Sequence, residues 1–197
     1  MPIVLSRRTG GSGGGNGSEP SDPVANGRIL TPGSPEFSSC GGLWLNDTAQ
    51  VSGQWNTAND PSAVAFTLPR GGLVKQLGWV NGTAAGGNHD IGIYDTSWNR
   101  LVSAGSTVGS GNSVWQWVNV ADTELAAGRY HLAIVRDNIT LNRVMYYVHA
   151  QQTYAFEFMG GSGSTTDSFP LPNPLVGMGT PTLTLVPVMG IAFRDPF

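Results

Sequence analysis

Hydrophobic and polar positions alternate along much of the chain after residue 43, which is the pattern of half-buried β-strands. In segment 129–136, alternate positions form two sets, which are Tyr130, Leu132 and Ile134 on one face and His131, Ala133 and Val135 on the other. In segment 113–120 the two faces carry Trp115 with Trp117 and Val114 with Val118 and Val120. Both segments are therefore predicted to be strands.

The same reasoning predicts nine strands, at residues 63–68, 73–81, 89–94, 100–104, 113–120, 129–136, 144–150, 154–158 and 183–193. Turn signals such as Asn81-Gly82 separate them. Pro187 inside the last segment predicts a bulge or an edge strand there. No segment has the spacing of an amphipathic helix with caps. We predict an all-β protein, an antiparallel β-sandwich of jelly-roll type with almost no helix.

The composition changes near residue 43. Residues 1–42 contain ten Gly, seven Ser and five Pro but one aromatic residue, Phe37. Such a segment buries too little apolar surface to offset its backbone entropy, so we expect a flexible or extended N-terminal arm ahead of a sandwich domain at 43–197. Six apolar residues of the arm are candidate assembly anchors: Ile3, Val4, Leu5, Val24, Ile29 and Leu30. A disordered tail without an anchoring role is the alternative.

A long loop is expected at residues 160–182, which are rich in Gly, Ser, Thr and Pro. Loops of this length inside a domain are commonly functional or ordered by a partner. The stretch 169–174 has the sequence FPLPNP and is typical of extended, polyproline-like chain. We therefore expect Phe169, Leu171 and Pro172 to contact a neighbouring subunit.

Charge and cysteine content exclude several classes of protein. Only 12% of the residues are charged, against about 25% in ordinary soluble domains, and the net charge is −3. Without a basic stripe, no nucleic-acid partner is expected. Cys40 is the single cysteine, so no intrachain disulfide and no cysteine-based metal site can form. The N-terminus does not have the pattern of a signal peptide, because its arginines follow the short apolar stretch instead of preceding it. No apolar run is long enough for a membrane helix.

The sequence contains no arrangement typical of a catalytic centre. The three histidines are His89, His131 and His149, and the serines between glycines lack the strand–turn–helix context of a nucleophile. His89 and Asp90 are neighbours on a predicted strand, so their side chains should point to opposite faces. Most acidic residues lie in predicted turns, where they cap the backbone. We expect no enzymatic activity, no metal and no cofactor.

Four tryptophans are candidate contact residues, at Trp55, Trp98, Trp115 and Trp117. Exposed aromatic rings can stack on the pyranose rings of a glycan, but large aromatics also dominate cores and subunit interfaces. For Trp115 and Trp117 a core or interface position is favoured over a glycan platform. For Trp55 and Trp98 both interpretations remain open.

Residues 91–135, IGIYDTSWNRLVSAGSTVGSGNSVWQWVNVADTELAAGRYHLAIV, resemble a jelly-roll module of tailed-phage virion proteins and related bacterial surface proteins. In that module a strand ending in "IY-D" leads through a turn to "LV-S-G", a tryptophan strand and "L-AG-Y-LAI". The resemblance implies a structural protein of the virion that docks through an N-terminal peptide and projects its β domain, often as a trimer.

Together these observations predict a non-enzymatic structural component of a tailed-phage particle, in its tail, a fibre or a capsid appendage. It would be made in the host cytoplasm and would bind other virion proteins and further copies of itself. Its arm would run along a neighbouring subunit and add hydrogen bonds to a sheet edge. The alternative is a carbohydrate-binding module or adhesin that recognises a host-surface glycan through its tryptophans.

Overall fold

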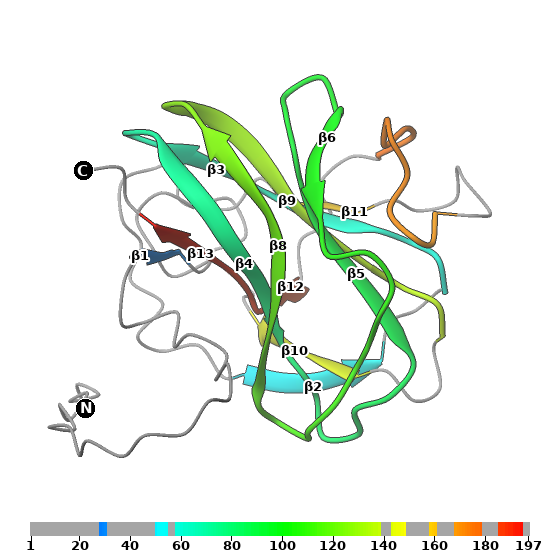
Figure 1. The fold of residues 1–197 in the computed structure, drawn as a ribbon. Coiled ribbons are helices and arrows are strands. Elements are labelled where there is room, and N and C mark those ends of the chain that lie inside the picture. Colours follow the sequence, from blue (N-terminus) through cyan, green and yellow to red (C-terminus); the bar gives the residue numbers. More distant parts are fainter. Residues whose placement is uncertain are drawn as a thin grey trace, which may run out of the picture.

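The computed structural model describes residues 28–30, 50–54, 58–138, 143–148, 158–160, 168–178 and 185–194 (Figure 1). These residues contain no helix, and every strand pairing among them is antiparallel. The predicted all-β antiparallel sandwich is therefore confirmed. Five of the predicted contact residues lie outside the described residues: Ile3, Val4, Leu5, Val24 and Trp55.

The first layer, sheet I, has four strands in the order β1-β13-β4-β8. Their bounds are Arg28–Leu30 for β1, Met189–Arg194 for β13, Gly72–Val80 for β4 and Trp115–Leu125 for β8. In this order β8 forms one edge of the sheet and β1 forms the other.

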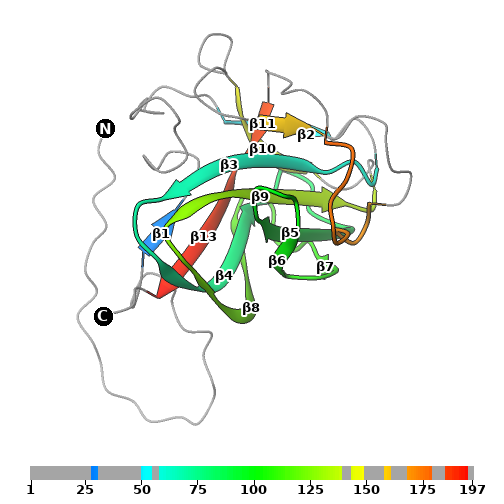
Figure 2. The same cartoon turned by 90° about the horizontal axis from the view of Figure 1, so that it is seen from above.

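The second layer, sheet II, has the order β11-β3-β9-β5-β6, and the short strand β7 also pairs with β5. The bounds are Phe158–Gly160 for β11, Ser62–Leu68 for β3, Gly128–Arg136 for β9, Asn88–Tyr94 for β5, Arg100–Ser103 for β6 and Thr107–Val108 for β7. Figure 2 shows sheets I and II layered against each other.

A third, smaller sheet has the order β12-β10-β2, with β12 at Leu185–Pro187, β10 at Arg143–Val148 and β2 at Gln50–Gln54. The single strand predicted at 183–193 is thus two strands in two sheets, because β12 pairs with β10 and β13 pairs with β4. Pro187 lies on the edge strand of the small sheet, as its missing N–H predicts.

The main core lies between sheets I and II and is made by alternate residues of their strands. On β9, Leu132 and Ile134 face this core, whereas Ala133 and Val135 belong to a second cluster on the opposite face. The two faces predicted from the alternation are therefore confirmed for β9. The main core contains Val64, Phe66, Leu68, Val74, Leu77, Trp79, Ile91, Ile93, Leu132, Ile134, Met189, Ile191 and Phe193, among others.

Strand β8 confirms part of the pattern predicted for 113–120. Val118 and Val120 pack against the main core, and Trp115 and Trp117 lie next to each other. Val114, however, precedes the strand and is exposed, so it does not join Val118 and Val120 in packing against the core. The strand also continues to Leu125 through a polar stretch that the hydrophobic pattern did not reveal.

Part of the predicted arm belongs to the sandwich. Residues Arg28–Leu30 form β1, and Ile29 lies opposite Ala192 of β13. Two of the candidate anchor residues, Ile29 and Leu30, are thus on a strand that extends sheet I. Strands β1, β2 and β7 were not predicted. Strands β1 and β7 are too short for alternation to be detected, and β2, with the sequence QVSGQ, contains one large apolar residue.

Candidate functional site

Two tryptophans form a stacked pair at the start of the edge strand β8. The ring centroids of Trp115 and Trp117 are 5.0 Å apart, and the ring planes differ by 12°. Trp117 lies over Gly78 of β4, where an added Cβ would come within 2.5 Å of the indole Cε3. Glycine at position 78 is therefore required for this packing. Trp115 remains 38% exposed.

Two exposed valines are bonded to groups at this end of β8 through their backbone carbonyls. Val114 directly precedes β8, and its carbonyl oxygen accepts a hydrogen bond from the Asn81 amide at 2.9 Å. The carbonyl oxygen of Val108 accepts one from the Gln116 side chain at 2.8 Å. We call Trp115 and Trp117 the β8 patch; Val108 and Val114 are also exposed, at 65% and 48%.

A network of uncharged polar groups holds the loop between β7 and β8, which contains Ser110. The Gln116 Oε1 atom accepts hydrogen bonds from the Ser110 amide at 2.8 Å and from Asn81 Nδ2 at 2.9 Å. Asn81 Oδ1 in turn accepts one from Trp79 Nε1 at 2.7 Å. Because Trp79 and Asn81 are fully buried, this chain of contacts ties the patch to the main core.

His89 lies at the same end of the core. Its ring stacks on Trp79 with centroids 5.0 Å apart, and neither ring nitrogen has a hydrogen-bond partner among the described residues. Burial, followed by the positive charge of Arg136, lowers the pKa of His89 to about 4, and Asp137 opposes the shift. Asp90 points to the other face of sheet II, as predicted from its adjacency to His89.

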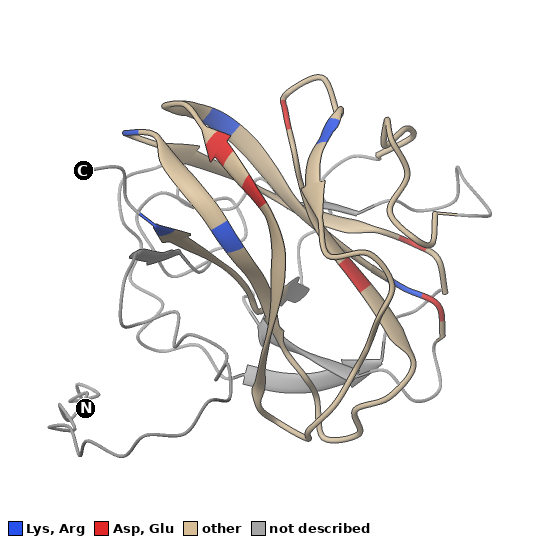
Figure 3. Ribbon diagram, viewed as in Figure 1, with Lys and Arg blue, Asp and Glu red and all other residues tan. Residues whose placement is uncertain are grey.

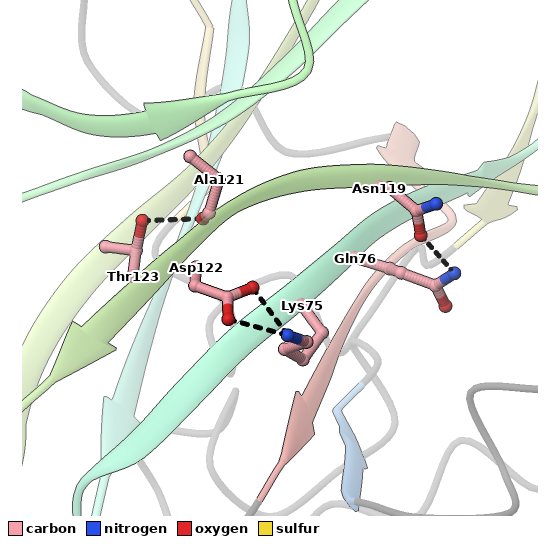
Figure 4. A network of polar contacts seen from close by, with 6 residues as sticks. All are labelled: Lys75, Gln76, Asn119, Ala121, Asp122 and Thr123. Atoms are coloured by element: carbon pink, nitrogen blue, oxygen red, sulfur yellow. Dashed lines mark hydrogen bonds and ion pairs between the residues drawn. The ribbon is translucent and has the colours of Figure 1, made fainter. Parts of the chain in front are cut away.

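Beyond the aromatic pair, β8 becomes polar and charged (Figure 4). Gln76 Nε2 donates to Asn119 Oδ1 at 2.8 Å, and Lys75 Nζ donates to both carboxylate oxygens of Asp122 at 2.5 and 2.7 Å. Both partners of this ion pair are well exposed, so it contributes little to stability. Within β8, the acidic positions drawn in Figure 3 all lie in the second half of the strand.

Trp98 lies in the turn predicted for it, but its ring is half-buried. It stacks on His131 with centroids 4.1 Å apart and ring planes 16° apart, and it packs against Tyr94 at 6.2 Å. The stack occupies one face of the indole. Trp98 is therefore a poorer candidate than Trp115 for a ring platform open to a ligand.

Residues 168–178, here called the strap, cover the outer face of sheet II. Leu171 and Leu175 are each 1% exposed and pack with Tyr94, Ala133 and Val135 in the second hydrophobic cluster. The side chain of Leu171 is thus buried in this chain's own second cluster and, contrary to expectation, does not face a neighbouring subunit. Phe169 packs against the same cluster, and Pro172 is half-buried.

Hydrogen bonds from sheet II anchor the strap. Asp90 Oδ2 accepts one from the Leu171 amide at 2.9 Å, and the Tyr94 hydroxyl donates to the Pro172 carbonyl at 2.7 Å. The Arg100 guanidinium donates to the Leu171 carbonyl. Burial raises the pKa of Asp90, while the Leu171 amide and the Arg100 charge oppose this. Nothing in the sequence indicated these contacts, because Asp90 and Leu171 are 81 residues apart.

Within the described ranges, no group of three or more His, Cys, Asp or Glu side chains is arranged to hold a metal ion. The same ranges contain no helix long and apolar enough to cross a membrane. Comparison with protein-family models and with curated proteins gives no match to this chain. The β8 patch, in which the Trp115 ring is 38% exposed, can contact protein or the face of a sugar ring.

The lowered pKa of His89 predicts a pH-dependent stability. His89 binds a proton near pH 6.5 in the unfolded chain but only near pH 4 in the folded chain. Its contribution to the free energy of unfolding is therefore fully present above pH 6.5 and is lost as the pH drops towards 4. The loss amounts to roughly 3 kcal/mol. His89→Phe keeps a ring on Trp79 but cannot titrate. Urea unfolding at pH 7 and pH 5 should show a smaller pH dependence for the variant.

The comparison between the two proteins isolates His89. Burial raises the pKa of Asp60 to about 6, and this carboxyl therefore destabilises the fold as the pH rises from 3.8 towards 6, the opposite sign. That contribution is common to both proteins and cancels in the difference. Equal pH dependence in the two would contradict the assignment.

The strap should be held by the Tyr94 hydroxyl. Tyr94→Phe removes this donor from the half-buried Pro172 carbonyl and should lower the free energy of unfolding by about 1 kcal/mol. It should also speed amide hydrogen exchange in the strap. Tyr130→Phe is the matched control, since its hydroxyl bonds at 3.1 Å to the exposed Ala126 carbonyl. An equal effect of the two substitutions would argue against the anchoring role.

Proposed function

We propose that this protein is a non-enzymatic structural component of a tailed-phage particle, in the tail, a fibre or a capsid appendage. It docks through its N-terminal arm, residues 1–42, and projects the β-sandwich. Its partners are other virion proteins and further copies of itself, with neither nucleic-acid binding nor membrane insertion. Its place of action is the virion.

The observation that carries this proposal is the pairing of β1 with β13. Residues Arg28–Leu30 come from a segment whose composition is that of a linker, yet they extend sheet I by backbone hydrogen bonding. A chain with this property can add to the edge of a sheet in a neighbouring subunit by the same chemistry. The apolar tip at Ile3, Val4 and Leu5 has the same β-forming character and supplies a second attachment point.

Two further features support the proposal. The resemblance of residues 91–135 to a virion module covers β5 to β9, which form most of sheet II and the edge of sheet I. Two buried polar side chains of the sandwich, Asp90 and Asn81, bind the strap and the loop that contains Ser110. Their roles are those of structural anchors.

Removal of residues 1–27 tests the docking role while leaving β1 in place. Particles assembled with this shortened chain should contain at most about a tenth of the normal number of copies, since a tenfold loss corresponds to only 1.4 kcal/mol of docking energy. Quantitative mass spectrometry of purified particles measures this. The triple variant Ile3→Ser, Val4→Ser, Leu5→Ser should give a similar loss at full length. Full occupancy with both proteins would refute docking through the arm.

A second candidate function is glycan binding at the β8 patch, favoured by the exposure of the Trp115 ring. Stacking of a pyranose on this ring would change its fluorescence. Titration with cell-wall oligosaccharides should then give a saturable signal that Trp115→Ala abolishes and Trp98→Ala preserves, because Trp98 is already stacked on His131. No saturable change would remove this candidate.

A further inference from the structure

The edge strand β8 is the longest strand in the described part of the chain, with 11 residues. It pairs with β4 on one side, and no described strand pairs with it on the other. An edge strand of this length presents backbone N–H and C=O groups that invite pairing with another chain. Soluble proteins usually protect such edges with charges, proline or bulges.

The second half of β8 has this protection. Gln76 lies opposite Asn119 and Val74 opposite Thr123, so three residues of β8 face a single residue of β4. This bulge at 120–122 interrupts the regular edge, and Asp122 and Glu124 place charge on it. Pairing with another strand is disfavoured there.

The first half, residues 115–119, has no such protection. Its register with β4 is regular from Val80 opposite Trp115 to Gln76 opposite Asn119. Its sequence, WQWVN, contains no charge and no proline. It carries the two stacked tryptophans of the β8 patch, and Val118 on its other face is only partly buried although it packs against the core. Among the described residues, this uncharged stretch of the strand edge has no strand partner.

We propose that residues 115–119 pair antiparallel with the same residues of a second copy of this chain, about a two-fold axis at Trp117. In this register Trp117 faces the partner's Trp117, and Trp115 faces the partner's Asn119. The two sheets I then continue into one antiparallel sheet. The proposal deepens the self-association included in the proposed function, and it concerns purified protein rather than particles.

The distribution of charge along β8 suits a second copy of this chain as the occupant. The segment carries no charge that would attract an acidic or basic partner. In the two-fold arrangement, Asp122 and Glu124 of each copy lie beyond opposite ends of the paired segment, so the acids do not repel each other. The cross-strand contact joins aromatic to aromatic residues, which is favourable in antiparallel pairs. Two-fold dimers are also the commonest symmetric assembly.

The solution mass of the full-length chain from about 1 to 100 µM, measured by sedimentation, tests the contact. We expect a dimer of twice 20.7 kDa at the upper concentrations. Trp115→Lys places a charge in the contact and should raise the dimer dissociation constant at least about tenfold. Leu101→Lys is the matched control, since Leu101 is 39% exposed, against 38% for Trp115, and lies on the edge strand β6 of sheet II. It should leave the constant unchanged.

Asn119→Lys gives a second variant at an exposed position opposite the partner's Trp115, and it decides the question if Trp115→Lys does not fold.

The proposal is overturned by a monomer at all concentrations, including one that binds oligosaccharide through Trp115. It is equally overturned by the trimer that the family resemblance implies. A dimer that is insensitive to the lysine variants, or as sensitive to Leu101→Lys, also overturns it. A monomer in particle-free solution does not bear on docking through the arm, which the number of copies in purified particles tests separately.

Discussion

The contact on which the rest of the structure depends is the packing of the inner faces of sheets I and II. Trp79 from β4, Phe66 from β3 and Phe193 from β13 lie in one cluster with the aliphatic residues of both sheets. Because alternate residues of each strand enter this cluster, the remaining residues must lie on the two outer faces. What covers those faces then decides which surfaces are free to bind.

The outer faces differ in what covers them. On sheet II the strap buries Leu171 and Leu175 against β5 and β9, with Asp90, Tyr94 and Arg100 bonded to its backbone, so this face is closed by the chain itself. On sheet I, the outer side of β8 carries an aromatic pair that is partly exposed at an edge without a strand partner among the described residues. This contrast is why the proposed contacts fall on sheet I.

The candidate site could be predicted in part. Alternation placed Trp115 and Trp117 on one face, and the turn residues around Trp98 placed it correctly outside a strand. The sequence did not reveal that Trp98 stacks on His131, or that Leu171 is buried. Leu171 follows a proline in a loop without periodicity, so only its contact with a carboxylate 81 residues away places it in the core.

By itself the sequence determined the longer strands of sheets I and II and the two faces of β9, because the alternation along a strand depends only on neighbouring residues. Tertiary structure alone decided which strands pair and where the chain changes sheet. Examples are the division into β12 and β13 around Val188, the pairing of Arg28–Leu30 with β13, and the position of β8 at the edge of the described sheet I. Each depends on segments far apart in the chain, and the free energy of such pairing has no local sequence signature.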